Sequence, residues 1–311
     1  MSKIITLTLN PCIDQTIWID KLIPDKKLKA KHPENEPGGG GINVSRAIKY
    51  LGYESKAIYF NGSYYGNYLN ELMQQERIDY VAANIAANTR MNLMLIDENT
   101  SLEYRIGMEG PLVSEPEIQN LLSILQQLND YDFLVASGSF PPTVPNNFYS
   151  EIAKIVEAHN AKLIVDTSGV PLQKTIQENL FLLKPNLNEL SMLCGIKEDV
   201  SIEEILQTTQ KLLLQINCTA IVVSLGKKGA VMVTANESHH ILPPDVKVKS
   251  TVGAGDCMVA GMTIALSKKL SWKEVLQYGI ACGTAATLNS GKGLCKKEDF
   301  EILLQQIQST H

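Results

Sequence analysis

Short β-branched segments alternate with amphipathic segments along most of this 311-residue chain. Strands separated by helices of roughly 10–15 residues are typical of βαβ units, in which helices cover both faces of a mostly parallel sheet. The strand-like segments are Ile4–Leu9, Ser55–Phe60, Phe133–Ala136, Lys162–Val165, Phe181–Leu183 and Ala220–Ser224. The helix-like segments are Gly41–Leu51, Tyr68–Arg77, Glu115–Leu128, Asn146–Ala158, Ile202–Ile216, Cys257–Leu266, Val275–Leu288 and Asp299–Gln308. The pattern predicts a three-layer α/β/α fold around a mostly parallel sheet.

Two segments interrupt this alternation, and both are too short to hold a core of their own. Residues 13–36 alternate loosely and then carry five lysines, Lys21, Lys26, Lys27, Lys29 and Lys31. Residues 88–107 have the pattern of a hairpin with a polar turn at Asp97–Ser101. We expect these two segments to form a small β-sheet lid on a single domain that spans residues 1–311.

Composition excludes several classes of protein. The chain has 28 Lys and Arg against 33 Asp and Glu, a net charge of −5, so a nucleic-acid or anionic-membrane partner is not expected. No apolar run reaches the roughly 18–20 residues of a membrane span, and the first residues lack the pattern of a secretory signal. The six cysteines form no C-x-x-C pair. We therefore expect a cytoplasmic protein without a zinc or disulfide framework.

The most informative motif is Thr251–Asp256, which leads into the apolar segment Cys257–Leu266. A helix that is apolar on nearly all sides is buried, so its first turn is fixed in position. The free N–H groups of that turn and the helix dipole favour an anion, such as a phosphoryl group in transfer. Asp256 then has two readings: a helix N-cap, or the base that accepts a proton from an attacking hydroxyl.

A second glycine cluster, Gly38–Gly41, also runs from a loop into a helix. Four consecutive glycines cost backbone entropy, which a chain tolerates where a ligand lies against bare backbone or where a hinge is needed. Asn43 follows on the first turn, where it could reach a sugar hydroxyl. Neither cluster matches G-x-x-x-x-G-K-[ST] or a G-x-G-x-x-G after a strand, so a P-loop enzyme and a nicotinamide-binding fold lack support.

With these motifs in place, the chain resembles the PfkB branch of the ribokinase-like sugar kinases over its whole length. The segments that carry the resemblance are Leu7–Asp14, Gly38–Val44, Ser137–Pro142, Lys184–Glu189, Val222–Gly226, Ser250–Asp256 and Ala285–Asn289. Within the family the chain is most similar to the type-2 (minor) 6-phosphofructokinase branch, which shares the four-glycine run, Tyr104-Arg105 and the Leu294-Cys295 pair. The fructose-1-phosphate and tagatose-6-phosphate kinases carry Gly-Lys-Gly inside the first cluster, where this chain has Gly39–Gly41.

The resemblance implies a ribokinase-like fold, ATP as co-substrate, and roles for individual residues. Asp256 would be the catalytic base for the 1-hydroxyl of the sugar, and the amides of Gly253, Ala254 and Gly255 would form the anion hole. The residues implied to contact the sugar are Asp14, Gly39, Gly40 and Asn43. Those implied to line the nucleotide site are Lys184, Asn186, Ser224, Gly226, Gly229 and Thr251. Asn186 and Glu189 match the family's magnesium motif, and the carbonyls of Ser250, Val252, Ala286 and Asn289 would hold a monovalent cation, commonly K⁺.

A phosphorylated sugar brings about two negative charges and needs cations that pair with them. Arg90 and Arg105 lie on the two strands of the expected hairpin, and Lys27 lies in the other lid segment. These three residues match phosphate contacts of the family, which also places Ser139 nearby. We expect them to converge on the sugar phosphate, whereas Lys21, Lys26 and Lys31 are expected to form a solvated face.

The sequence thus predicts a Mg·ATP-dependent kinase that phosphorylates the 1-hydroxyl of fructose 6-phosphate, and a homodimer formed through the lid. The alternatives of the same class are a tagatose-6-phosphate kinase and a 1-phosphofructokinase. A sugar-phosphate-binding regulator without catalysis is an alternative of a different class. Cys257 stands where the family has Ser, and because a helix N-terminus lowers a thiol pKa, we expect an oxidisable cysteine there.

Overall fold

The computed structural model of the chain describes residues 3–289 and 293–310. Within them, nine strands form the main sheet in the order β13-β12-β11-β10-β9-β8-β1-β4-β5. The strands from β11 to β5 run parallel, and β12 and β13 add an antiparallel edge. Their bounds are β1 Ile4–Thr8, β4 Lys56–Gly62, β5 Asp79–Ile85, β8 Phe133–Ser137, β9 Lys162–Asp166, β10 Leu180–Leu183, β11 Cys218–Ser224, β12 Ala230–Thr234 and β13 Ser238–Ile241.

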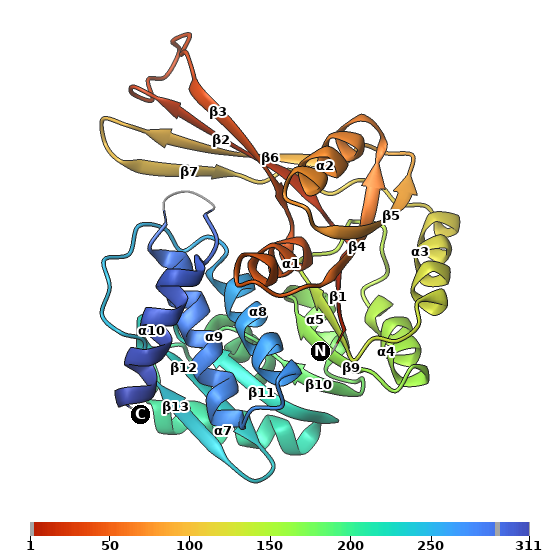
Figure 1. Ribbon diagram of the computed structural model, residues 1–311, viewed down its shortest axis with the longest axis vertical. Coiled ribbons are helices and arrows are strands. Elements are labelled where there is room, and N and C mark those ends of the chain that lie inside the picture. Colours follow the sequence, from red (N-terminus) through yellow and green to blue (C-terminus); the bar gives the residue numbers. More distant parts are fainter. Residues whose placement is uncertain (1–2, 290–292, 311) are drawn as a thin grey trace.

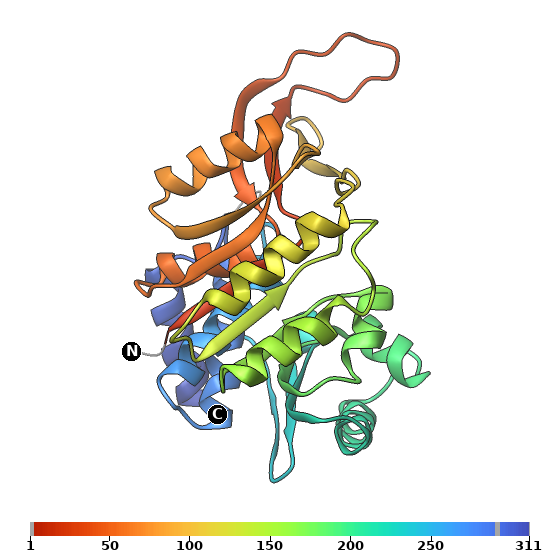
Figure 2. The same cartoon turned by 90° about the vertical axis from the view of Figure 1, so that its right-hand side faces the viewer.

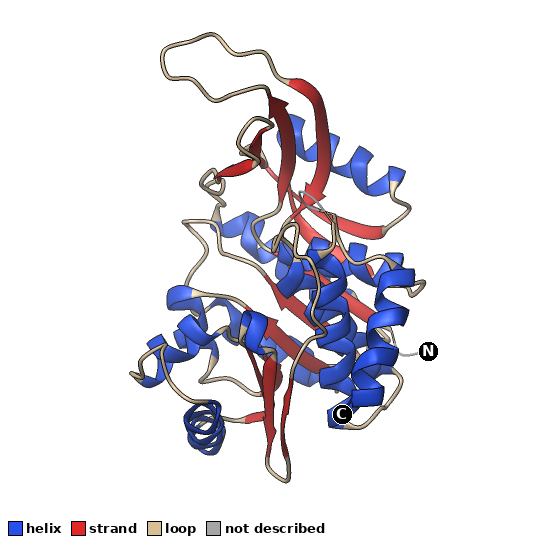
Figure 3. Ribbon diagram, turned by 90° about the vertical axis from the view of Figure 1, so that its left-hand side faces the viewer, coloured by secondary structure: helices blue, strands red, loops and turns tan. Residues whose placement is uncertain are grey.

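Helices cover both faces of this sheet, as the alternating sequence predicts. One face is covered by α1 Gly40–Tyr50, α2 Ser63–Gln75, α8 Ala254–Ser267, α9 Trp272–Thr287 and α10 Lys297–Thr310. The other is covered by α3 Glu115–Gln127, α4 Phe148–Ala158, α5 Gly169–Thr175, α6 Leu187–Cys194 and α7 Ile202–Gln215. Figure 2 shows α3 and α4 lying along the strands on that second side, and Figure 3 shows the strands between helices.

Successive residues of a strand pack into the hydrophobic cores on opposite faces of the main sheet. Ile4 of β1 packs with α1 and α8, whereas Ile5 and Leu7 pack with α3 and α4 on the opposite face. Side chains of a strand alternate between faces, so a parallel strand covered on both sides is apolar at almost every position. This is why short, almost continuously apolar segments of the sequence identify the strands of the main sheet.

Helix α8 is the most deeply buried helix, and it packs between α1 and α9. Every residue from Cys257 to Leu266 is buried. The buried residues that follow therefore hold the first turn of α8 in a fixed position. Within residues 3–289 and 293–310, every helix is too short or too polar to span a bilayer.

A separate small sheet has the order β3-β2-β6-β7, with bounds β2 Cys12–Ile19, β3 Lys31–Gly38, β6 Arg90–Asp97 and β7 Leu102–Ile106. In the chain, β2 and β3 come between β1 and α1, and β6 and β7 come between β5 and α3; the sheet that they form projects from the body (Figures 1 and 3). β2 pairs parallel with β6, while β3 and β7 are antiparallel edges. The sheet is built from the two segments that interrupt the sequence pattern, as expected.

The structure also contains elements that the sequence did not reveal. β5, the β12–β13 hairpin, α5 and α6 were not predicted, and α2 begins at Ser63 rather than at Tyr68. β5 and β13 lie at the edges of the main sheet and mix polar with apolar residues. α2 follows β4 without a side-chain cap, and Ser63 has a positive φ of 51°. β5, β13 and the first turn of α2 therefore lack the periodicity and capping signals that identify other elements.

Candidate active site

The candidate residues collect at one edge of the main sheet, beyond the carboxyl ends of its parallel strands. Asn10 follows β1, Ser139 follows β8, Asp166 ends β9, Lys184 follows β10 and Ser224 ends β11. Parallel strands end at the same edge, and ligands of open α/β sheets bind there, where the strand order reverses. The reversal lies at β1, which has β8 on one side and β4 on the other.

The two glycine-rich segments meet at this edge. Gly39 is the N-cap of α1 with a φ of 112°, and Gly40 presses so closely on the end of β8 that a Cβ would lie 2.4 Å from Ser137 Oγ. Asn43, on the first turn of α1, donates a hydrogen bond of 2.9 Å from Nδ2 to Asp256 Oδ2. The N-terminal turns of α1 and α8 thus face each other through these two side chains.

Asp256 lies on the first turn of α8, behind Gly253, which has a left-handed φ of 73°. Gly253 precedes this turn, and Ala254 and Gly255 begin it. Backbone N–H groups at this end of a helix lack intrahelical acceptors. Burial raises the pKa of Asp256 to about 7, and the charge of Asp166 adds to the rise, while the Asn43 hydrogen bond and Lys184 oppose it. A carboxyl with such a pKa can accept a proton near neutral pH.

Lys184 is buried beside this carboxyl. Its ammonium forms an ion pair of 3.0 Å with Asp166 Oδ1 and lies 3.7 Å from where a Cβ on Gly255 would be. Burial lowers the pKa of Lys184, but Asp166 outweighs it and holds the pKa above its ordinary value, so the ammonium is charged. Sequence reasoning missed Asp166, although a carboxylate directly after the buried strand Lys162–Val165 was a signal for it.

Asn186 and Glu189 form a capping box at the start of α6. Glu189 N donates to Asn186 Oδ1 at 2.9 Å, and Asn186 N donates to Glu189 Oε2 at 2.8 Å. Burial raises the pKa of Glu189, against the hydrogen bond from Asn186. Asn186 also bridges to Ser224 at the end of β11, and Gly226 and Gly229 flank the next turn with positive φ. Asn186, Ser224, Gly226 and Gly229 of the predicted nucleotide residues therefore adjoin one another.

Asp14, the predicted sugar-binding carboxylate, lies on β2 of the small sheet. Its Oδ1 accepts hydrogen bonds from Asn92 Nδ2 at 2.9 Å and from Cys12 Sγ at 3.2 Å. A Cβ on Gly38 would lie 2.1 Å from Asp14 Oδ2, so only glycine fits there. Asn92 and Cys12 were not singled out from the sequence, because their role depends on the pairing of β2 with β6.

Arg90 and Arg105 share a face of the small sheet, and Lys27 lies in the loop beyond its far end. Arg90 pairs with Cys12 at the base of the sheet, and its guanidinium donates to the carbonyls of Asn10 and Met108. Arg105 lies opposite Met94 on the same face, exposed and paired with Glu103 at 3.2 Å. Lys27 lies in the exposed loop beyond Ile19, at the far end of the sheet.

Lys27 lies in the loop at the far end of the small sheet, whereas Arg90 lies at its base, and the convergence of the two on a sugar phosphate stays a prediction. Seven register steps separate Arg90 from the far end of β6, roughly 23 Å at about 3.3 Å per residue. Ser139 does lie near the base of the sheet, because its Oγ accepts a hydrogen bond from Asn10 Nδ2 at 3.1 Å. Lys21, Lys26 and Lys31 are exposed, as expected.

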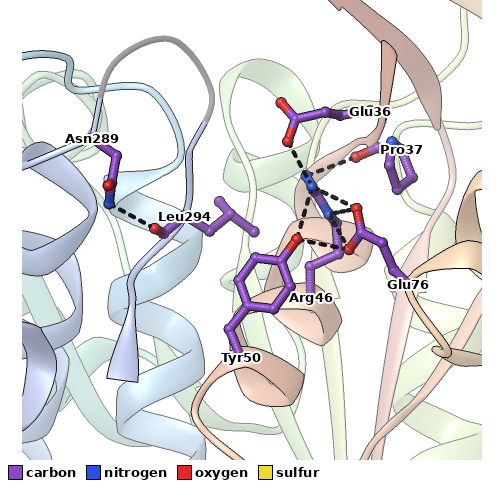
Figure 4. Close-up of polar contacts among 7 residues, drawn as sticks. All are labelled: Glu36, Pro37, Arg46, Tyr50, Glu76, Asn289 and Leu294. Atoms are coloured by element: carbon purple, nitrogen blue, oxygen red, sulfur yellow. Dashed lines mark hydrogen bonds and ion pairs between the residues drawn. The ribbon is translucent and has the colours of Figure 1, made fainter. Parts of the chain in front are cut away.

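The segment before α8 lies against the C-terminal end of α9. Lys249 N and Ser250 N donate to Thr287 O at 2.8 and 3.4 Å, so Ser250, Thr251 and Val252 adjoin the last turn, which contains Ala286. Asn289 Nδ2 donates to Leu294 O at 3.0 Å (Figure 4), and Leu294 in turn contacts Gly253. Backbone carbonyls at a helix C-terminus suit a monovalent cation, and this arrangement fits the predicted K⁺ ligands.

Cys257 differs from the expectation. Its side chain is fully buried, its Sγ accepts a hydrogen bond of 3.4 Å from Cys295 N, and burial raises its thiol pKa well above the ordinary value. The predicted lowering by the helix N-terminus is wrong, because the cost of placing a thiolate among apolar side chains outweighs the helix dipole. Cys257 is a packing residue beneath the first turn of α8.

Comparisons with known proteins agree with this geometry. The model of the pfkB family of carbohydrate kinases matches residues 7–299. The chain is 36% identical over 302 residues to the ATP-dependent 6-phosphofructokinase isozyme 2 of Escherichia coli K12, covering 97% of each chain. It is 31% identical to the 1-phosphofructokinase of Bacillus subtilis 168, covering 99% of each. The crystal structure of phosphofructokinase-2 from Escherichia coli in complex with potassium superposes with a TM-score of 0.95 at 35% identity, covering 99% of this chain and 100% of that one.

Proposed function

Because the chain belongs to the pfkB family of carbohydrate kinases, we propose that it transfers a phosphoryl group from ATP to the 1-hydroxyl of fructose 6-phosphate. The product is fructose 1,6-bisphosphate. The observation that supports the proposal is the hydrogen bond from Asn43 to Asp256, because it joins the residue proposed to bind the sugar to the proposed base, whose pKa is about 7. Asp256 takes the proton of the 1-hydroxyl as its oxygen attacks the γ-phosphoryl group in line.

The other groups at this edge stabilise the transferred charge. The first-turn amides at 253–255 face the γ-phosphoryl group, and the buried ammonium of Lys184 supplies a positive charge beside them. Asp14, Gly39, Gly40 and Asn43 hold the sugar. The nucleotide lies along Lys184, Asn186, Ser224, Gly226, Gly229 and Thr251.

Two cations fit the residues present. Mg²⁺ binds through one or two carboxylates together with substrate phosphates and water, and the carboxylates of Glu189 and Asp166 both lie beside Lys184. When bound, Mg²⁺ neutralises phosphate charge. The carbonyls of Ser250, Val252, Ala286 and Asn289 would hold K⁺ close to the start of α8.

The preferred sugar phosphate is decided by one assay. Purified protein is given ATP and Mg²⁺ with fructose 6-phosphate, tagatose 6-phosphate or fructose 1-phosphate, and ADP release is measured. We expect the highest kcat/KM with fructose 6-phosphate. A higher value with either other sugar supports the corresponding alternative kinase, since the 1-phosphofructokinase relative is nearly as similar. No ADP release with any of them supports the non-catalytic regulator.

The proposal also covers the domain organisation and the homodimer. The whole chain acts as one kinase domain in the cytoplasm, the small sheet covers the sugar as a lid, and two copies associate through their small sheets. Arg90 and Arg105 bind the sugar phosphate from one face of the small sheet, and Lys27 lies in the loop at its far end. No nucleic-acid or membrane partner is proposed.

A further inference from the structure

A buried guanidinium joins the small sheet to the body of the enzyme (Figure 4). Arg46 lies on α1, one turn after Asn43, and its side chain is 2% exposed. Nε donates to both carboxylate oxygens of Glu76 at 3.0 and 2.9 Å, and Nη2 lies 2.9 Å from Glu36 Oε1. Nη1 donates to the carbonyl of Pro37 at 3.1 Å.

These contacts reach two different elements. Glu76 is the C-cap of α2, and its partly buried carboxylate accepts from Nε and lies 2.7 Å from Nη2, so it compensates the charge of Arg46 within the body. Glu36 and Pro37 are the residues of β3 that precede the glycine run. Through them the guanidinium fixes the place where the small sheet joins α1.

That place lies next to the sugar-binding carboxylate. Glu36 is the direct cross-strand partner of Asp14 in the β2–β3 register, and Gly38 contacts the Asp14 carboxylate. Two carboxylates opposite each other on one face repel, so a cation that binds one of them relieves the repulsion and holds it aside. Arg46 binds Glu36 in this way, and the same helix presents Asn43 to Asp256.

We propose that Arg46 and Glu36 are positioning residues that hold Asp14 on the small sheet in register with Asn43 and Asp256 on the body. Glu36 links Arg46 to β3 and so positions Asp14, whereas Glu76 mainly compensates the charge of the buried Arg46 guanidinium. The inference rests on the proposed sugar site at Asp14. It adds two residues that do not themselves contact the sugar.

The experiment compares three carboxylate-to-amide substitutions. Glu36→Gln weakens the link to β3, Glu76→Gln weakens the link to α2, and Glu34→Gln removes an exposed carboxylate from the same face of β3 as a control. KM for fructose 6-phosphate and for ATP, kcat and the melting temperature are measured for each. Hydrogen exchange of peptides covering 31–42 and 63–78 is followed without substrate.

We expect Glu36→Gln to raise KM for fructose 6-phosphate by about threefold to tenfold, the effect of losing one charge-assisted hydrogen bond. KM for ATP and kcat stay close to wild type, and exchange rises in peptide 31–42 only. Glu34→Gln leaves every value unchanged. Glu76→Gln lowers the melting temperature and raises exchange in peptide 63–78, because the buried guanidinium loses the carboxylate that pairs with Nε.

Any one of three results would overturn the proposal. In Glu36→Gln, KM for fructose 6-phosphate could stay unchanged, or KM for ATP could rise by the same factor. In Glu34→Gln, KM for fructose 6-phosphate could rise as much as in Glu36→Gln. If wild type phosphorylates no sugar phosphate, the proposed function fails, and hydrogen exchange still tests the positioning. In that case, equal exchange of peptide 31–42 in wild type and Glu36→Gln overturns the inference.

Discussion

The side-chain amide of Asn43 donates to the carboxylate of Asp256 over 2.9 Å, and the two residues are 213 positions apart in the chain. The contact joins the first turns of α1 and α8, the two helices that follow the glycine-rich segments. It also sets the charge of the base. Burial raises the pKa of Asp256 and the charge of Asp166 adds to the rise, whereas the Asn43 hydrogen bond lowers it, so the pKa of about 7 is a balance of these effects.

The pH profile of kcat/KM should report this balance. Asp256 must be ionised to accept the proton, so we expect kcat/KM to rise with pH through an acid limb near 7. Asn43→Ala removes the hydrogen bond that favours the carboxylate, and the limb should move to higher pH. Steady-state kinetics between pH 5.5 and 9 would show it. A limb that stays in place, or moves to lower pH, would contradict the assignment.

Asp256→Asn should remove the base without disturbing the fold. We expect kcat to fall by about 10²–10⁴, the usual contribution of general base catalysis, while ATP still binds. Turnover and a fluorescent-nucleotide titration measure the two properties separately. A kcat within twofold of wild type would exclude Asp256 as the base.

The same substitution should stabilise the unliganded protein at high pH. The pKa of Asp256 is higher in the folded chain than its ordinary 3.8, so the folded state binds the proton more tightly. The stability from that proton is complete below about pH 4 and is lost as pH rises to 7. At pH 8 we expect Asp256→Asn to unfold less readily than wild type, by at most about 4 kcal/mol at about 1.4 kcal/mol per pKa unit. Urea unfolding at pH 8 and pH 4 measures the difference. An equal effect at both pH values would contradict it.

The strands of the main sheet and both glycine-rich turns could be predicted because their signals are local. β1 is a short apolar run, and Gly253–Asp256 precedes an apolar helix within one segment. The ion pairs of Asp166 with Lys184 and of Arg46 with Glu76 could not be predicted in this way, since only the tertiary fold brings these partners together. Lys27 depends on the motif match alone, and its contact with the phosphate stays a prediction because it lies in the loop at the far end of the small sheet from Arg90.

Arg90→Ala should chiefly raise KM for the sugar phosphate. A phosphate that does not react is bound equally in the ground and transition states, so kcat should change little. Arg90→Lys should not restore KM, because the planar guanidinium bridges the carbonyls of Asn10 and Met108 and an ammonium cannot reproduce that fork. Arg105→Ala is the comparison on the same face, and its effect should be smaller because Arg105 is exposed. An unchanged KM in Arg90→Ala would remove Arg90 from the phosphate site.

Cys257 should resist thiol reagents in the folded enzyme. Its sulfur is fully buried beneath the first turn of α8 and accepts a hydrogen bond from Cys295 N, so the reactive thiolate is suppressed. Mass spectrometry after brief iodoacetamide treatment should find Cys257 unmodified, with modification appearing only after unfolding. Cys257→Ser keeps an acceptor for Cys295 N at nearly the same size, and kcat should stay within about twofold because a surface-inaccessible sulfur contacts no substrate. Rapid alkylation of Cys257 in the native enzyme, with parallel loss of turnover, would restore the view that this position is a reactive cysteine.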